Sequence, residues 1–155
     1  MSSNVKPIPS GYHTVTPYLV VSDIGEAIDF YRRALGARET TSQKGPDGSL
    51  IHGEVQIGDS RVMLGQEGVC EQGARKGCDC SLMLYVEDAD AAVRKAVAAG
   101  AQQTMAVENT FWGDRMGQVT DPFGHSWAIC THVEDLTHDE VARRAQDFFA
   151  AHAHK

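Results

Sequence analysis

The chain repeats itself at a spacing of 64 to 65 residues, and this internal repeat constrains the fold more than any other feature of the sequence. LVVSDIGEAIDFYRRALGA (residues 19–37) resembles MLYVEDADAAVRKAVAAGA (83–101), because each has an apolar run, an acidic turn, a helical segment and a stop of small residues. GEVQIGDSRVML (53–64) likewise matches GQVTDPFGHSWAI (117–129). Two copies of one structural unit therefore fill most of the chain.

Each copy has the pattern of a strand, a helix and three further strands. In the first copy, alternating β-branched residues predict a strand over 14–21, and Asp23 follows it as a helix N-cap. Apolar residues three and four positions apart predict the helix, which ends at Gly36. The other predicted elements are strands over 38–43, 49–57, 60–65, 81–86, 102–110, 115–120 and 125–131, a helix over 89–99 and a tail helix over 137–151.

The composition is that of a folded, acidic protein. Of the 155 residues 42% are apolar, which is enough for a core, and the formal net charge of −7 disfavours a nucleic-acid surface and suits a neutral or cationic ligand. No apolar run is long enough to cross a membrane, and the first residues lack a hydrophobic signal core. We therefore expect a cytoplasmic protein with reduced thiols at Cys70, Cys78, Cys80 and Cys130.

A duplicated βαβββ unit that carries LVVSDIGEAIDFYRRALGA and VTDPFGHSWAI resembles the vicinal oxygen chelate superfamily. That superfamily includes glyoxalase I, extradiol dioxygenases, fosfomycin-resistance enzymes and bleomycin-binding proteins. The sequence of residues 111–137 is similar to that of its PhnB-like branch. The resemblance implies an α+β fold in which two tandem modules form curved mixed sheets around a cavity, and it implies a homodimer. We expect one domain with module one at about 12–66, a linker at 67–79, module two at about 80–132 and a C-terminal helix at about 137–151.

The resemblance also points to four positions where metal-dependent relatives have metal ligands, on the first and last strands of the two modules. Here these positions hold Thr16, Met63, Ser81 and Ala128. None of the four is a good ligand for a divalent ion that prefers carboxylate or imidazole. We therefore expect no metal at these positions and no other cofactor.

Because side chains alternate along a strand, the same four positions predict which residues face the cavity. The predicted ligand-binding residues on these strands are Thr16, Tyr18, Arg61, Met63, Ser81, Met83, Tyr85, Ser126, Ala128 and Cys130. Methionines, tyrosines and small polar groups suit an organic ligand that is held by stacking and dispersion and oriented by a few hydrogen bonds. The opposite faces of these strands are more uniformly apolar, and Trp127 is expected there in the core.

The other predicted ligand-binding residues are His52, Glu54, Phe111 and Trp112, and the last three also have a structural interpretation. His52 occupies a strand position that could face the cavity, and Glu54 is either an anchor for a cationic ligand or an outward-facing strand residue, the second being favoured. Phe111 and Trp112 are either an aromatic lid over the cavity or a hydrophobic plug at a dimer interface, with Asp114 and Arg115 paired across a turn.

Two metal alternatives remain open at this point. His13, His52, Glu54 and His132 could form a transition-metal site, although no pair has a diagnostic spacing. Cys70, Cys78 and Cys80 could bind a soft ion, since the resemblance extends to proteins that handle organoarsenicals through cysteines.

The sequence favours a small-molecule-binding protein without catalytic residues, which sequesters a drug or metabolite. One alternative is a metal-dependent lyase, isomerase or dioxygenase with relocated ligands, or a metal-free enzyme with Glu54, Tyr18 or His52 as base. Others are a thiol-based soft-metal or organoarsenical-handling protein and an interaction module that docks through its tail helix. The expected partners are a small organic ligand and a second copy of the chain.

Overall fold

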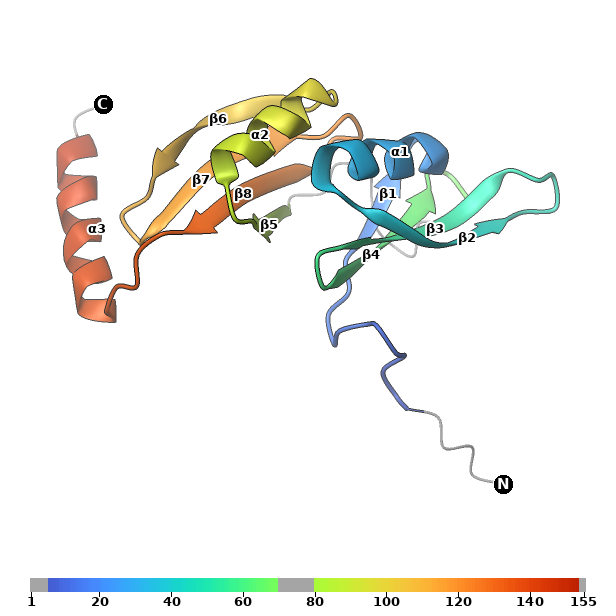
Figure 1. Ribbon diagram of the computed structural model, residues 1–155, viewed down its shortest axis with the longest axis horizontal. Coiled ribbons are helices and arrows are strands. Elements are labelled where there is room, and N and C mark those ends of the chain that lie inside the picture. The colour runs from blue at the N-terminus through green and yellow to red at the C-terminus, as the bar shows by residue number, and fades with distance from the viewer. Residues whose placement is uncertain (1–5, 70–79, 154–155) are drawn as a thin grey trace. The chain divides into compact units, whose positions relative to one another are not determined.

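The computed structural model describes residues 6–69 and 80–153. They form two compact units: the first holds residues 6–69 and the turn Pro122–His125, and the second holds the other described residues from Cys80 onward. Each unit has one four-stranded sheet with a helix on one face (Figure 1). The α+β architecture of two βαβββ modules and a C-terminal helix agrees with the prediction.

The first unit consists of β1 (Tyr18–Val21), α1 (Ile24–Leu35), β2 (Arg38–Lys44), β3 (Leu50–Ile57) and β4 (Ser60–Gln66). Its strand order is β1-β4-β3-β2, with β1 parallel to β4 and the other pairs antiparallel. β3 and β4 are therefore the central strands of this sheet.

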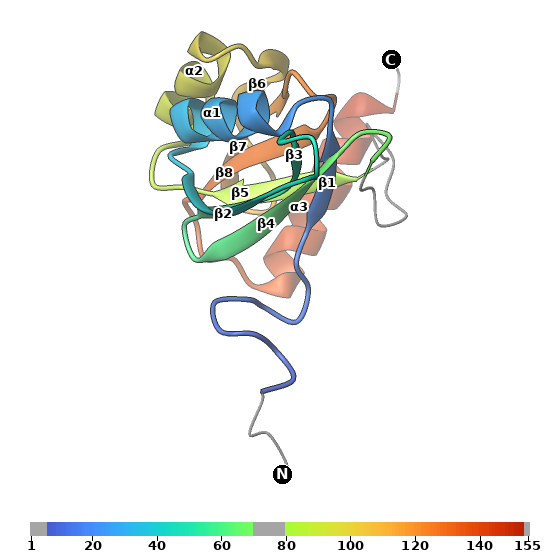
Figure 2. The same cartoon turned by 90° about the vertical axis from the view of Figure 1, so that its right-hand side faces the viewer.

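Helix α1 covers one face of this sheet and packs mainly on β3 (Figure 2). Asp23 caps it by accepting a hydrogen bond from the Glu26 N–H at 2.8 Å, and Gly36 ends it with a φ of 66°. A Cβ atom at Gly53 would lie 2.8 Å from Cγ2 of Ile24, so this glycine lets the helix approach the strand closely. The buried residues of the helix are Ile24, Ala27, Ile28, Phe30, Tyr31 and Ala34.

The first strand is shorter than predicted. The sequence pattern predicted a strand over 14–21, but β1 begins at Tyr18. Pro17 precedes it and has no N–H to donate to a neighbouring strand, although its carbonyl accepts a hydrogen bond from Met63 N at 2.9 Å. Thr16 consequently lies before the strand, with its hydroxyl donating to the His13 carbonyl at 3.0 Å.

The second unit repeats the arrangement with strand order β5-β8-β7-β6. Its elements are β5 (Ser81–Tyr85), α2 (Ala89–Ala98), β6 (Gln102–Asn109), β7 (Asp114–Thr120), β8 (Ser126–His132) and α3 (His138–His152). Trp127 is buried, as predicted. None of α3's residues is buried, and no helix in the described ranges is long and apolar enough to cross a membrane.

The DPFG turn (residues 121–124) connects β7 to β8, as predicted, and its aromatic side chain also packs in a hydrophobic core. Gly124 has a φ of 89°, and the Asp121 carboxylate accepts a hydrogen bond from the Trp127 indole at 2.9 Å. Phe123 is buried among the rings of Phe30 and Tyr31, at centroid distances of 6.2 and 6.1 Å. The aromatic side chain of the turn is therefore part of the first unit's core.

Candidate functional site

In the first unit, polar side chains gather on the sheet face that points away from α1. The register sets Tyr18, Met63 and Glu54 side by side across β1, β4 and β3. His52 and Arg61 lie two positions away on β3 and β4 and so share this face. The structure thus brings five of the predicted ligand-binding residues together.

Glu54 is the centre of this face, with 5% of its surface exposed. Its Oε2 accepts hydrogen bonds from the Tyr12 hydroxyl and, at 3.4 Å, from Arg61 Nη1, and its Oε1 lies 3.1 Å from His52 Nε2. Burial acts to raise the pKa of Glu54, but the hydrogen bonds from Tyr12, His52 and Arg61 outweigh it and lower the pKa below its usual value. Glu54 is therefore ionised at neutral pH.

The favoured interpretation of Glu54 as an outward-facing residue was wrong. On β3, Gly53 and Val55 face α1, so the alternation of the strand turns His52 and Glu54 to the opposite face. β3 is a central strand, and its neighbours on that face supply the hydrogen-bond donors. A carboxylate can be buried there because these donors compensate its lost hydration.

Sequence reasoning missed Tyr12, which lies in the segment before β1. Besides its hydrogen bond to Glu54, its ring lies under the guanidinium of Arg61, whose Cζ is 4.8 Å from the ring centroid. The hydrogen bond to Glu54 raises the pKa of the Tyr12 hydroxyl, and burial adds to this. Since 42 residues separate Tyr12 from Glu54, no local pattern could have revealed the contact.

In the second unit, the sheet face opposite α2 carries the six predicted residues of β5 and β8. The parallel register pairs Ser81 with Ser126, Met83 with Ala128 and Tyr85 with Cys130. Met83 and Tyr85 are 52% and 59% exposed, whereas Ala128 and Cys130 are buried under Met105, Trp112 and Met116. This face therefore combines a small apolar cluster with exposed sulfur and aromatic surface.

Asp114, at the start of β7, is a second buried carboxylate and was not predicted as a site residue. Only 2% of it is exposed, and its Oδ2 accepts hydrogen bonds from the Tyr85 hydroxyl and the Trp112 indole, each at 3.0 Å. Its Oδ1 lies 2.9 Å from His132 Nδ1. Burial acts to raise the pKa of Asp114, but the hydrogen bonds from His132, Tyr85 and Trp112 outweigh it, so the pKa is lowered.

His132 connects this carboxylate to the segment that follows β8. Its Nε2 lies 2.9 Å from Oδ1 of Asp135, and hydrogen bonds first to Asp114 and then to Asp135 raise the pKa of His132. The backbone N–H groups of Val133 and Glu134 both donate to the Gly113 carbonyl at 3.0 Å. The loop before β7 and the exit of β8 are thus joined through both side chains and backbone.

The sequence-based pairing of Asp114 with Arg115 was wrong. Adjacent residues of a strand point to opposite faces, so Arg115 turns towards α2 while Asp114 turns away from it. The guanidinium of Arg115 binds Asp90 of α2 at 2.9 Å.

Phe111 and Trp112 both lie in the loop before β7, at 4.9 Å between ring centroids. Trp112 is fixed by its hydrogen bond to Asp114, and Phe111 packs against Phe148 and Phe149 of α3 at 5.3 and 5.9 Å. The aromatic pair therefore joins the end of the sheet face to the C-terminal helix, and its roles as a lid or as a dimer plug both stay predictions.

The two described thiols lie in different environments. Cys130 is buried, and burial followed by the charge of Asp114 raises the pKa of its thiol, while Cys80 is exposed. Cys70 and Cys78, which belong to the predicted thiol cluster, lie outside the described residues. His13 is exposed and precedes β1.

The four positions where metal-dependent relatives have ligands do not offer a ligand set for a divalent ion. Met63 and Ala128 have no oxygen or nitrogen donor in their side chains. The hydroxyl of Thr16 donates to the backbone, and that of Ser81 lies 3.4 Å from the Ser126 hydroxyl. Within residues 6–69 and 80–153, no group of three His, Cys, Asp or Glu side chains is arranged to hold a metal ion.

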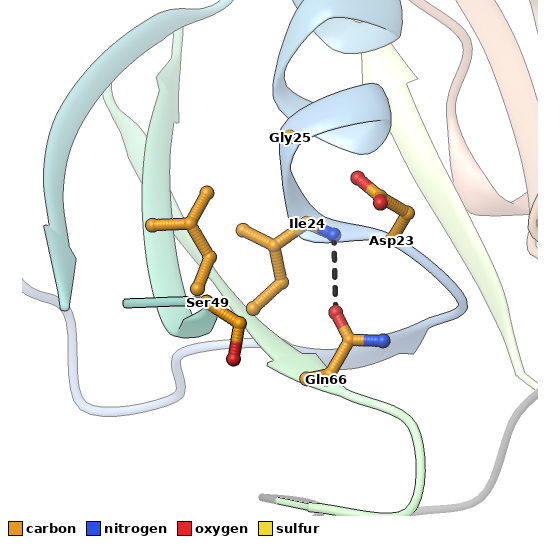
Figure 3. Close-up of a pocket in the computed structure, with 6 residues that line it drawn as sticks. Asp23, Ile24, Gly25, Ser49 and Gln66 are labelled. Atoms are coloured by element: carbon orange, nitrogen blue, oxygen red, sulfur yellow. Dashed lines mark hydrogen bonds between the residues drawn. The ribbon is translucent and has the colours of Figure 1, made fainter. Parts of the chain in front are cut away.

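The described residues of the first unit line a pocket of about 380 Å³ between the N-terminal segment and Met63, and Tyr12, His13 and Thr16 are among its lining residues. A further pocket, of about 430 Å³, lies at the start of α1 and is lined by Asp23, Ile24, Gly25, Ser49, Leu50 and Gln66 (Figure 3). There the Gln66 side chain accepts a hydrogen bond from the Ile24 N–H at 3.4 Å and donates to the Ser22 carbonyl at 2.6 Å. The helix end is therefore already capped by protein groups.

The family model of the Glyoxalase/Bleomycin resistance protein/Dioxygenase superfamily matches residues 12–129. The chain belongs to this superfamily. An uncharacterised protein of Mycobacterium bovis is 38% identical over 148 residues, which span 91% of this chain and 93% of that protein.

Solved structures of other proteins share the fold. TioX from Micromonospora is 25% identical with a TM-score of 0.65, over 78% of this chain and 99% of TioX. A PhnB protein from Bacillus cereus is 15% identical with a TM-score of 0.60, over 77% of this chain and 99% of that one. This likeness supports the PhnB-like resemblance seen in the sequence at the level of the fold.

Proposed function

We propose that this superfamily member binds a small organic molecule on the sheet faces that point away from α1 and α2, and that it does so without a divalent metal ion. In this proposal the protein sequesters a drug or metabolite and does not convert it. In this proposal it works as a homodimer, as its resemblance to the wider superfamily implies, and in the cytoplasm, as the sequence composition led us to expect.

The observation that carries the proposal is the exposed apolar surface beside the Asp114 network. Met83 and Tyr85 are 52% and 59% exposed on a strand whose alternate residues turn towards α2. A thioether adapts to irregular ligand shapes, and a tyrosine ring offers a flat surface for stacking. Because Asp114 binds the Tyr85 hydroxyl, this ring is held in place before a ligand arrives.

The state of the buried carboxylates supports binding over catalysis. Glu54 and Asp114 have lowered pKa values and are each engaged by three side chains, so both are weak general bases. The raised pKa of the Cys130 thiol, caused by burial and Asp114, likewise makes it a weak nucleophile at neutral pH.

A thermal-shift screen followed by calorimetry tests the proposal. The panel contains planar aromatic cations, glycopeptides, mitomycin-like compounds and hydrophobic metabolites. A ligand at a hundred times its Kd should stabilise the folded protein by about 2.7 kcal/mol, and Met83→Glu should weaken its binding at least about tenfold.

Val97→Glu is the matched control, since Val97 is also exposed but lies on α2. Its affinity for the same ligand should equal that of the wild type. A panel without any binder, or a ligand whose affinity both variants leave unchanged, would count against the proposed face.

A further inference from the structure

The N-terminal segment, residues 6–16, brings a phenol ring to the polar face of the first unit. The Tyr12 hydroxyl donates to Glu54 Oε2, and the guanidinium carbon of Arg61 lies 4.8 Å from the ring centroid. The phenol is therefore held both at its hydroxyl and over its ring. Any small phenol can make the same two interactions.

The groups that receive the ring belong to the sheet and not to the segment. Glu54 and Arg61 stand on the central strands β3 and β4, and Arg61 Nη1 lies 3.4 Å from Glu54 Oε2. His52 adds a contact to the other carboxylate oxygen at 3.1 Å. Because the strand register positions these three side chains, the phenol subsite is preformed when Tyr12 moves away.

The segment itself has the features of a displaceable element. Ile8 and Val15 are 46% and 82% exposed, and the hydrogen bond from Tyr12 N to the Pro9 carbonyl is internal to the segment. Exposed segments with little apolar burial open at low free-energy cost.

With the N-terminal segment in this position, one of the hydrogen-bond donors of Arg61 lacks an acceptor in the described part of the chain. Arg61 Nε is buried without a hydrogen-bond acceptor among the described residues. Gly11 packs closely beside it, since a Cβ atom at Gly11 would lie 3.2 Å from Nε and 3.0 Å from Nη2. A buried donor without an acceptor is unfavourable, so departure of the segment recovers part of what the Tyr12 contacts contribute.

A pocket already lies next to the subsite. The cavity of about 380 Å³ between the segment and Met63 is lined by Tyr12 itself and by Pro7, Ile8, Pro9, His13, Thr14 and Thr16. This volume accommodates a compound with a single aromatic ring. A ligand can therefore bind beside Tyr12 before it takes the place of the ring.

We propose that Tyr12 is an intramolecular stand-in for the ligand, and that a small neutral phenol displaces its ring and binds Glu54 and Arg61 instead. This inference rests on the proposed function and names the ligand class of the first unit. The hydrogen bond to Glu54 raises the pKa of the Tyr12 hydroxyl, in keeping with an ionised carboxylate that accepts from a protonated phenol. The same negative charge disfavours a phenolate.

Titration of the full-length chain with p-cresol, the side-chain analogue of tyrosine, tests this inference. Binding is measured by calorimetry and by the methyl NMR signal of Met63, for the wild type and for Tyr12→Ala. Removal of the competing ring should tighten p-cresol binding on the order of tenfold, because the subsite is then always open. Toluene, which lacks the hydroxyl, should bind Tyr12→Ala at least about tenfold more weakly than p-cresol.

Two further variants complete the design. Val15→Ala changes an exposed residue of the same segment and should bind p-cresol like the wild type. Glu54→Gln in the Tyr12→Ala background should lose at least about tenfold in affinity, since the charged acceptor is gone. Circular dichroism checks that each variant is folded.

Equal affinity of the wild type and Tyr12→Ala for p-cresol would overturn the inference, as would toluene binding as tightly as p-cresol. If p-cresol fails to bind Tyr12→Ala while a screened compound binds the Met83 face, the inference fails and the proposed function stands. If no compound binds either unit, both fail.

Discussion

At the scale of single residues, Glu54 and Asp114 are buried carboxylates that share two kinds of partner and lie at non-equivalent positions of the repeat. Glu54 lies in the middle of β3, where the repeat pairs it with Gln118, whereas Asp114 begins β7. Each binds a tyrosine hydroxyl and a histidine, and a third donor completes the set. The two modules have thus acquired different polar centres on one shared framework.

The ion pair of His132 with Asp114 predicts a specific pH dependence of stability. Because the pKa of His132 is raised in the folded protein, its bound proton stabilises the fold below the unfolded value of about 6.5. This stabilisation is lost as the pH rises through the folded-state pKa. His132→Gln keeps a hydrogen-bond donor but not the charge, so its deficit in unfolding free energy should be largest near pH 5.5 and shrink towards pH 8.5.

Urea unfolding of both proteins at several pH values measures this difference. Asp114, whose pKa is lowered, stays ionised throughout this range and does not add a titration of its own. A deficit that is constant or grows with pH would show that His132 is not held as a cation by Asp114 and Asp135.

At the scale of elements, Gly113 is the point where the loop before β7 meets the exit of β8. Its φ is 99°, and a Cβ atom there would lie 2.5 Å from the carbonyl oxygen of Glu134. Gly113→Ala should therefore lower the unfolding free energy by about 3 kcal/mol or more, through backbone strain and a clash with main-chain atoms.

Gly48→Ala is the matched control, since Gly48 has a φ of 83° with no atom near its missing Cβ. It should cost about 1 kcal/mol, the strain alone. Circular dichroism during urea unfolding compares the two variants. Equal losses would mean that the contact with Glu134 does not restrict the loop.

The elements were largely predictable, because apolar periodicity and caps are local signals. The αL conformation of Gly36 and the Asp23 cap lie where the sequence indicated. Pro17 shifted the start of β1 because its missing N–H outweighs the β propensity of Thr14 and Val15.

The polar networks were not predictable, because they depend on pairs far apart in the chain. Tyr12 meets Glu54 across 42 residues, and Tyr85 meets Asp114 across 29. The alternation rule did predict which strand residues share a face, including Met83 with Tyr85. It could not predict that a residue outside the strands, Tyr12, would complete one of these faces.

At the scale of the whole molecule, this member of the Glyoxalase/Bleomycin resistance protein/Dioxygenase superfamily has a duplicated βαβββ framework. Thr16, Met63, Ser81 and Ala128 lack the carboxylate and imidazole groups that a divalent ion prefers. The chemistry of the two sheet faces lies instead in methionine, tyrosine and hydrogen-bonded carboxylates. These are groups that bind organic molecules directly.

Calorimetric titration of chelator-treated protein with the tightest ligand from the screen tests metal-free binding most directly. Our account predicts the same Kd, within a factor of about two, before and after chelation and after addition of Zn²⁺, Mn²⁺ or Ni²⁺. Binding that disappears with the chelator and returns with one of these ions would contradict it.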